Sequence, residues 1–465
     1  MPLSTDAKKV YISFKGSLGD LMIFTKDKAF YSDLLRLAVP MALGNLISFL
    51  ITLTDSVVVG KLGDGACAAV FSGTLIATTL QMLITGVEGG ITLGISQYYG
   101  KGEGEPIKRI FSLGTLIIFA LGVFLFLPSF LIPNAIASAF GSGGGGEYLK
   151  VLSLSFPLFA VSGGIGAALR GVESVKIVTF SSFVAFAVNL VLDVLLVFGK
   201  LGFTNMGILG AALATVIARA VELSILILYL FFKDRKIKIT KKELFRLEQK
   251  ISRDFFKYTS PILLGQIIWI INTLFFSSVF ASFSSDAVLT GLSVANTLNS
   301  LAYISINGLS GAVGIIVGRT VGEGKTAKLR EYAYTTQAIF IILGILTLAA
   351  LLLVKDPFIS LYSVSEEAIQ IAKSFITVLA FTSVGTAYQL ACLTGLVRGG
   401  GDTSFILKND AVFIFLFVIP LTLVALRLDA PLPVILLALK SDQLLKCIPA
   451  AIKINHFCWV KNVTR

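Results

Sequence analysis

Two stretches of this sequence decide the fold: GVEGGITLGISQYYGKG at residues 86–102 and GLSGAVGIIVGRTVGEG at residues 308–324. Glycines stand at matching positions in both stretches. Two further pairs of strings match in the same order, and they are Ala38-Val39-Pro40 with Thr259-Ser260-Pro261, and Leu169-Arg170-Gly171 with Val397-Arg398-Gly399. Self-similarity at a nearly fixed offset predicts a chain built of two repeated halves.

The composition of the chain excludes a soluble protein. Of its 465 residues, 55% are hydrophobic and only 14% are charged, and the mean hydropathy is +0.87. A soluble globular chain is about 25% charged, and its surface could not accommodate this many apolar side chains. A soluble enzyme and a soluble nucleic-acid-binding protein are therefore excluded, and the chain is predicted to reside in a lipid bilayer.

Apolar windows of about 20 residues, the length needed to cross the hydrocarbon core as a helix, recur along the chain. Twelve of them begin near Leu37, Ala66, Ile110, Leu152, Val178, Ile208, Pro261, Val288, Ala338, Ser374, Ala411 and Ala430. The sequence therefore predicts an all-α integral membrane protein with twelve transmembrane helices. An even number of helices returns each half to its starting side, so the two six-helix lobes are expected to be related by a pseudo-two-fold axis along the membrane normal.

Charge along the chain predicts its segments and its orientation. We expect an N-terminal segment at 1–35, an N-lobe at 36–232, an amphipathic linker at 233–257, a C-lobe at 258–454 and a tail at 455–465. Most of the 39 Lys and Arg residues lie on the side of the two termini, which predicts a multi-pass cell-membrane protein with both termini in the cytoplasm. Anionic lipid headgroups then explain the net charge of +12, and no nucleic-acid partner is expected.

Nothing in the sequence predicts a metal site, apart from a candidate Na+ site described below. The four cysteines stand far apart with no Cys-x-x-Cys spacing, and the single histidine, His456, lies in the polar tail. Residues with this spacing do not indicate a zinc or haem site. The chain also lacks the His-Glu-x-x-His and Gly-x-Ser-x-Gly strings of hydrolytic enzymes, so it is not expected to be an enzyme.

A set of oxygen-bearing side chains lies inside the predicted spans of the first half. Asp55 is late in the first span, and its counterpart in the second half is Phe276, which predicts an acidic function confined to the N-terminal half. Asn189 and Asp193 are four residues apart, so they share one face of the fifth helix, and Thr215 adds a hydroxyl from the sixth. Because carboxylates inside a membrane are costly, this set is a candidate site for a hard cation or a shared proton. A polar packing network between helices is the alternative.

Other charges inside the predicted spans are candidate cavity or gating groups. Arg219 and Glu222 are spaced i,i+3, and Asp442 and Lys446 are spaced i,i+4, so each pair can neutralise itself on one helix face. Packing pairs of this kind are the first interpretation. Glu88 has no adjacent partner in the sequence, and it is expected to line a cavity of the first half.

The most specific motif is the string GLVRGGGDT at residues 395–403, which resembles the signature after the tenth helix of the multidrug and toxic compound extrusion (MATE) family. Residues 169–174 are a weaker echo of it, residues 189–193 and 210–215 are similar to the fifth and sixth helices of the family, and residues 55–63 resemble its first-helix acidic motif. The residues that carry the signature are Arg170, Arg398, Gly399, Asp402 and Thr403.

The resemblance implies a twelve-helix, two-lobed exporter that needs no cofactor and exchanges an entering H+ or Na+ for an outgoing organic compound. It assigns the oxygen-bearing set described above to the coupling cation. Residues 265–272 and 386–390, where one branch of the family carries carboxylates, contain none here. This difference favours the DinF-like branch over the NorM-like branch.

The expected partners are small organic substrates, cationic or amphipathic, and the lipid bilayer, for a chain that acts as a monomer. A lipid-linked precursor flippase of the same broader superfamily is the alternative function, because it could share the paired six-helix lobes. That function would need a basic cleft for a pyrophosphate headgroup, whereas the notable feature of this sequence is its acidic set.

Overall fold

The computed structural model describes residues 24–139, 145–240, 243, 248–283, 285–362 and 364–464. Within these ranges the chain is almost entirely helical, and the β structure is limited to an isolated bridge between Gly401 and Val460. The all-α fold predicted from the apolar windows is therefore confirmed.

Six helical spans form the N-lobe. They are α2 (Lys28–Gly60), α3 (Asp64–Lys101), α4 (Gly104–Leu131), α6 (Gly146–Ser153) continued by α7 (Ser155–Gly171), α8 (Val175–Leu192) continued by the π-helix η1 (Asp193–Val197), and α9 (Ile208–Phe232). Two short elements lie in the connections, and they are α5 (Pro133–Ala139) and the 3-10 turn η2 (Lys200–Gly202).

The C-lobe repeats this order. Its spans are α10 (Gln249–Ala281), α11 (Asp286–Gly322), α12 (Thr326–Ile359), α13 (Glu366–Gln389) continued by the π-helix η3 (Leu390–Val397), α14 (Thr403–Phe413) continued by η4 (Ile414–Val418) and α15 (Ile419–Arg427), and a last span made of α16 (Leu432–Leu439), α17 (Ser441–Leu445) and α18 (Cys447–Asn455).

Eleven of these spans are long and apolar enough to cross a membrane, counted over the described ranges. The twelfth, predicted to begin near Ala430, is divided into three short helices. The first break lies at Lys440, whose backbone (φ −104°, ψ 9°) departs from helical geometry. The predicted number of six spans per lobe is thus present, with the last one segmented.

The first helix of each lobe begins earlier than its apolar window. α2 begins at Lys28 and α10 at Gln249, so residues 28–35 and 249–257, expected in the terminal segment and the linker, are helical. An apolar window locates only the part of a helix that hydrocarbon can surround. The additional turns are amphipathic and bury apolar side chains against protein instead.

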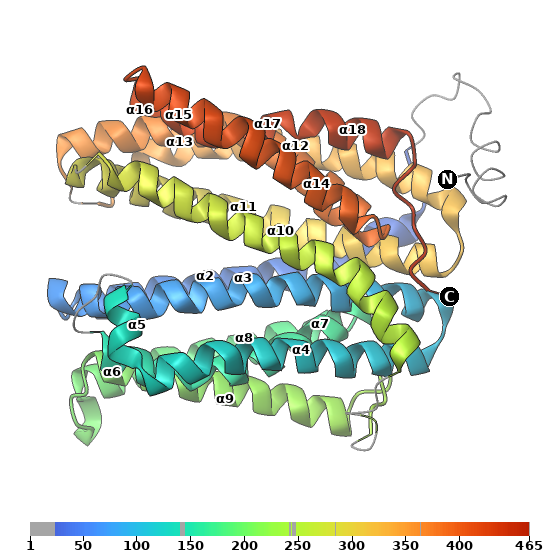
Figure 1. Ribbon diagram of the computed structural model, residues 1–465, viewed down its shortest axis with the longest axis horizontal. Helices are drawn as coiled ribbons and strands as arrows, with labels where there is room; N and C mark the ends of the chain where they lie inside the picture. The colour runs from blue at the N-terminus through green and yellow to red at the C-terminus, as the bar shows by residue number, and fades with distance from the viewer. Residues whose placement is uncertain are drawn as a thin grey trace.

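Figure 1 shows the helices in two layers, with α2 to α9 in blue and green below and α11 to α18 in yellow to red above, while the yellow-green α10 begins in the lower layer and crosses to the upper one. The long helices run roughly along the longest axis of the molecule. The C-terminal tail lies at the end of the molecule where α2 and α10 begin, which we call the basic end. The predicted division into two lobes is confirmed.

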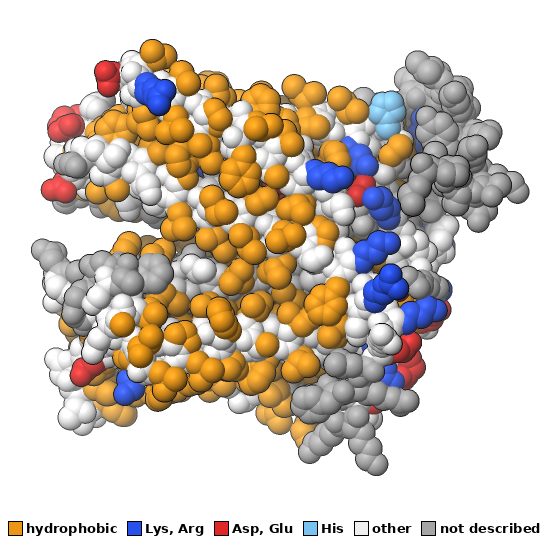
Figure 2. All heavy atoms as spheres, viewed as in Figure 1, with side chains coloured by type: hydrophobic (Ala, Val, Ile, Leu, Met, Phe, Trp, Pro, Cys, Tyr) orange, Lys and Arg blue, Asp and Glu red, His pale blue; other side chains and the backbone are white. Residues whose placement is uncertain are grey.

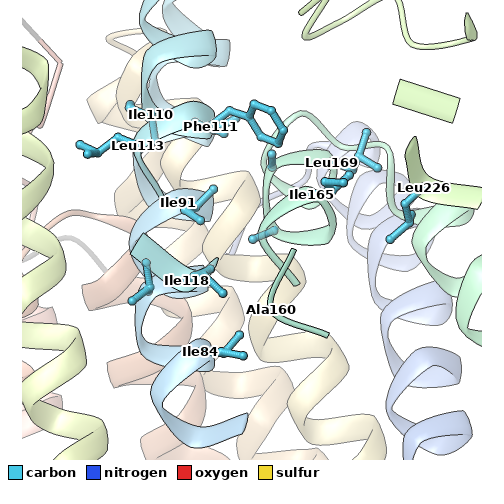
Figure 3. Close-up of a cluster of buried hydrophobic side chains, with 14 of the residues drawn as sticks. Ile84, Ile91, Ile110, Phe111, Leu113, Ile118, Ala160, Ile165, Leu169 and Leu226 are labelled. Atoms are coloured by element: carbon cyan, nitrogen blue, oxygen red, sulfur yellow. The ribbon is translucent and has the colours of Figure 1, made fainter. Parts of the chain in front are cut away.

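The first helix of each lobe packs its opening turns into the core of the other lobe. Phe30, Leu34 and Leu37 of α2 are buried in a cluster with side chains of α11, α12 and α13. Reciprocally, Phe255 and Tyr258 of α10 are buried in the N-lobe core. Figure 3 shows that N-lobe core, in which isoleucine side chains fill the space between neighbouring helices. The two lobes therefore share their cores at the basic end.

At the opposite end each lobe has a core of its own. Val58, Val59, Val197 and Ala211 form a cluster in the N-lobe. A separate cluster joins α10, α11, α13 and α16 in the C-lobe, and neither cluster includes a described residue of the other lobe. Figure 2 shows the surface hollowed between the lobes at this end. The lobes are joined at the basic end and separate at the other.

The close contact between α3 and α11 follows the sequence repeat. A Cβ atom at Gly100 would overlap the carbonyl oxygen of Arg319, and a Cβ atom at Gly322 would overlap the carbonyl oxygen of Gln97. The two contacts are counterparts, because the offset that relates Gly100 to Gly322 also relates Gln97 to Arg319. Glycine is needed on both helices because small residues let two backbones approach this closely. The glycine strings that reveal the repeat thus build the contact between its halves.

The outer surface is apolar around the middle of the molecule. Figure 2 shows a broad hydrophobic band across both lobes, with Lys and Arg side chains gathered near the basic end. Many large hydrophobic side chains are exposed, among them Phe124, Leu131, Phe180 and Leu416. An exposed apolar area of this extent fits contact with lipid acyl chains.

Candidate functional site

The oxygen-bearing residues predicted from sequence come from three neighbouring spans of the N-lobe, which are α2, α8 with its continuation η1, and α9. Asp55 lies near the end of α2, Asn189 in the last turn of α8, and Thr215 in α9. Asp193 is the first residue of the π-helix η1. π-Helical turns insert one extra residue and occur often at functional sites. The structure therefore brings all four residues to one side of the N-lobe.

The two carboxylates of this group lie close together. Asp193 and Asn189 are 0% and 1% exposed, Asp55 is half-buried, and the charges of Asp55 and Asp193 act on each other. Both carboxylate oxygens of Asp193, one of Asp55 and both amide atoms of Asn189 have no hydrogen-bond partner among the described residues. Like charges this close repel strongly where the dielectric constant is low. A proton or a cation between them would remove that cost.

Asp55 connects this group to a cavity of about 380 Å³ in the N-lobe. Thr215 and Arg219 also line the cavity, and aromatic rings form much of its wall, among them Phe71, Tyr148, Phe156 and Phe159. Asn189 and Asp193 lie outside the lining. A molecule in the cavity could therefore reach Asp55 first, with the second carboxylate buried behind it.

Arg219 has two kinds of partner beside this cavity. Its guanidinium forms the expected ion pair with Glu222 at 2.8 Å and stacks on the ring of Phe159, 4.6 Å from the ring centroid. Glu222 in turn accepts a hydrogen bond from the hydroxyl of Ser182. The charge of Arg219 also acts on Asp55, so the ion pair of Arg219 with Glu222 is part of the electrostatic surroundings of the carboxylates and more than a packing pair.

Glu88 has no neighbour in sequence to pair with, but the fold supplies one. Its carboxylate accepts a hydrogen bond from Arg170 at 2.7 Å, from a residue at the end of α7. Both side chains line a cavity of about 360 Å³ between the lobes, to which Met41 of α2 and Gly311 of α11 also contribute. Periodicity along one helix cannot reveal a pair that two helices form.

The C-lobe contains a buried charge cluster that the sequence revealed only in part. The expected pair of Asp442 with Lys446 is present at 3.0 Å, and the structure adds Asp410 at 2.9 Å from the same ammonium group. Lys446 is 0% exposed, and its ammonium lies 4.9 Å from the centre of the Trp269 ring. The expectation that buried acidic residues serve only the N-lobe is therefore corrected. Asp410 was missed because it stands at the edge of its apolar window and looks like a loop residue.

The signature residues after η3 hold the C-terminal tail in place. Asp402, 2% exposed, accepts hydrogen bonds from Lys453 at 2.8 Å and from Lys461 at 2.7 Å. Burial alone would raise the pKa of Asp402, but these two lysines lower it below the usual value for aspartate. Thr403 is buried at the start of α14. The role of Asp402 is therefore structural.

A second network at the basic end links the lobes. Gln97 of α3 donates to the carbonyl oxygen of Gly399 at 3.2 Å and accepts from the backbone N–H of Val463 in the tail. On the other side, Arg319 of α11 forms ion pairs with Asp33 of α2 at 2.7 Å and with Glu173 at 2.5 Å. Sequence reasoning did not find these contacts, because their partners are far apart along the chain.

Comparisons with known proteins agree with this architecture. The family model described as MatE matches residues 40–195 and 261–424, one stretch in each lobe. The chain is 23% identical over 381 residues to a probable multidrug resistance protein NorM of Thermotoga maritima, a match that covers 80% of both chains. It is 24% identical over 360 residues to a protein of the same description from Neisseria meningitidis serogroup B, covering 76% of this chain and 77% of the relative.

Solved structures share the fold. A MOP superfamily transporter from Pyrococcus furiosus superposes with a TM-score of 0.83 at 20% identity, covering 93% of this chain and 97% of the other. The Vibrio cholerae MATE transporter VcmN in its bent form gives a TM-score of 0.80 at 17% identity, covering 92% and 96%. The family match extends over most of both lobes, and its two stretches coincide with the two halves of the sequence repeat. The chain belongs to the MatE family of membrane transporters.

Proposed function

We propose that this protein is an antiporter that couples the entry of H+ or Na+ to the export of organic compounds by alternating access. The observation that carries the proposal is a pair of neighbouring carboxylates, of which Asp193 is buried and Asp55 is half-buried and lines a cavity with aromatic walls. The relatives described as multidrug resistance proteins support export as the direction of transport.

The substrates we propose are cationic or amphipathic organic molecules. The N-lobe cavity combines one accessible carboxylate with the rings of Phe156 and Phe159. Such a surface binds apolar bodies of varied shape, and it attracts a positive charge through both the carboxylate and the faces of the rings. Protonation of Asp55, or Na+ bound beside it, would remove the attraction and favour release.

α2 offers a mechanical route from the cation to the contact between the lobes. Asp55 is near one end of this helix, while Phe30 and Leu34 at the other end are buried in the C-lobe core. A shift of α2 on cation binding would therefore act on the end where the lobes are joined. If the basic end lies in the cytoplasm, an arrangement with the lobes joined at that end and separate at the other would let a cation reach Asp55 from outside.

The energetics constrain how export is driven. Each elementary charge that moves through 100 mV releases about 2.3 kcal/mol, which sustains a gradient of about fiftyfold for a neutral substrate. If one monovalent cation enters for each monovalent cationic substrate that leaves, no net charge moves. The concentration gradient of the coupling ion alone would then drive export.

The experiment is transport of a fluorescent organic cation such as ethidium in proteoliposomes, with a pH gradient and a Na+ gradient imposed separately. We expect one gradient to drive transport, and we expect Asp55→Asn and Asp193→Asn each to reduce that transport by about tenfold or more, as expected for loss of an interaction worth at least 1.4 kcal/mol. Asp286→Asn is the matched control, because this carboxylate is exposed at the start of α11. Transport that ignores both gradients, or that survives both substitutions, would refute cation coupling at this site.

A further inference from the structure

Arg398 is the C-lobe counterpart of Arg170, but the repeat gives it no acidic partner. Arg170 pairs with Glu88 at 2.7 Å. The offset that relates the glycine strings places Ser310 where Glu88 stands in the N-lobe. The hydroxyl of Ser310 donates to the carbonyl oxygen of Leu390 at 2.7 Å, so it is engaged elsewhere. One of two equivalent arginines therefore keeps a net positive charge.

The rest of the fold does not supply the missing acid. Asp410 is the carboxylate whose charge acts on Arg398, but one of its oxygens already accepts from Lys446 at 2.9 Å. No carboxylate forms an ion pair with Arg398 within the described ranges, and the buried Nε of Arg398 has no hydrogen-bond partner there. A guanidinium stays charged at any physiological pH, and a buried charge without a partner is costly. A ligand that brought an anionic group would remove this cost.

Arg398 is accessible to a ligand, because it lines two cavities. One is the cavity between the lobes, and the other is a C-lobe cavity of about 310 Å³. Several uncharged side chains that can donate hydrogen bonds line the C-lobe cavity together with Arg398, and they are Gln266, Asn307, Gln389, Thr394 and Thr403. The ring of Trp269 and apolar side chains such as Ile262 also line the cavity, together with Asp410, whose carboxylate is paired with Lys446. The volume and this mixture of donors and apolar wall are typical of a small-molecule site.

We infer that the C-lobe cavity binds the carboxylate or phosphate group of a small organic anion or zwitterion, with Arg398 as the charged anchor. A guanidinium can donate two parallel hydrogen bonds to either group, which gives geometric selectivity as well as affinity. Asn307 and Gln389 line the same cavity and carry amides that can donate to such a group, and Trp269 can pack against an apolar body. The inference rests on the proposed export function and extends its substrates to anions.

The test is isothermal titration calorimetry on the full-length protein in detergent, with naphthaleneacetate and its uncharged analogue naphthaleneacetamide as probes. We expect the carboxylate to bind at least about tenfold more tightly than the amide, a difference of about 1.4 kcal/mol. Arg398→Gln should abolish that preference, and Arg398→Lys should restore only part of it. Competition by acetate and by inorganic phosphate distinguishes the two groups, because the stronger competitor identifies the one that the site prefers.

The control is Lys408→Gln, which removes a positive charge from an exposed position of α14 and should leave the preference unchanged. Equal affinities for the two probes in the wild-type protein would overturn the inference. So would a preference for the carboxylate that persists in Arg398→Gln. Because calorimetry measures binding without any ion gradient, its result is independent of the transport assay. Anion binding at Arg398 can be absent while cation-coupled transport persists, and it can be present while cation-coupled transport fails.

Discussion

A single methyl group at the contact between the lobes should shift the protein toward opening at the basic end. In Gly322→Ala the new Cβ atom would overlap the backbone carbonyl of Gln97, which cannot move aside as a flexible side chain can. Overpacking of this kind costs about 1–3 kcal/mol. The cost falls only on the state in which α3 and α11 touch. The equilibrium with a state open at this end should therefore move by about five- to 150-fold.

The assay is the rate at which a membrane-impermeant maleimide modifies Ser96→Cys in a background without the four native cysteines. Ser96 is 0% exposed and packs against Gly318 at this contact. We expect Gly322→Ala to raise the rate of modification within the stated range. Gly104→Ala is the matched control, since a Cβ atom there meets nothing within 4 Å at the same end of the molecule.

A second variant separates opening from unfolding. In Gly100→Ala the new Cβ atom would overlap the carbonyl oxygen of Arg319, and this contact is the repeat counterpart of the one at Gly322. The substitution should therefore raise the rate of maleimide modification in the same way. Both variants should retain a cooperative thermal transition in detergent. If both fold and the rate of modification equals that of the Gly104→Ala control, the reasoning that this backbone contact closes the basic end is refuted.

Two further results follow from the buried ion pairs. Lys446→Met should destabilise the protein by about 3–5 kcal/mol, because it leaves Asp410 and Asp442 buried without their cation. Thermal unfolding in detergent measures the loss of stability. A loss below about 0.5 kcal/mol, typical of a surface position, would contradict the prediction. The pKa of Asp402 is lower in the folded protein than in the unfolded chain, where an aspartate has a pKa of about 3.9. The contribution of Asp402 to folding stability should therefore be complete at pH values above about 3.9 and decline as the pH falls below that value. The unfolding temperatures of the wild-type protein and of Asp402→Asn, measured from neutral to acidic pH, should converge at low pH. A difference between the two unfolding temperatures that does not narrow would count against the role of the Lys461 and Lys453 contacts.

Much of the fold could be predicted from patterns that are local or periodic. Mean hydropathy placed the chain in a bilayer, apolar windows located its spans, and the glycine strings at 86–102 and 308–324 revealed the two halves. Pairs on one helix face, such as Asp442 with Lys446, were also visible, because helical geometry alone brings residues four apart together. Asp55 was grouped with Asp193 because both are carboxylates inside predicted spans of the same half, and their charges act on each other in the structure.

Contacts between distant segments could not be predicted in this way. The pairs Glu88–Arg170 and Arg319–Asp33 join residues on different helices, and their formation depends on how each helix is rotated against its neighbours. The pair of Asp410 with Lys446 likewise joins two different spans.

The sequence by itself thus determined a membrane protein of two repeated six-span halves with basic loops on one side. The tertiary structure decided that the halves exchange the first turns of α2 and α10, that their cores join at one end and separate at the other, and that Arg398 lacks the acid its counterpart has. The physical reason is that hydrophobicity and helical period act along the chain, whereas side-chain packing and charge pairing act across space and depend on the relative placement of the helices.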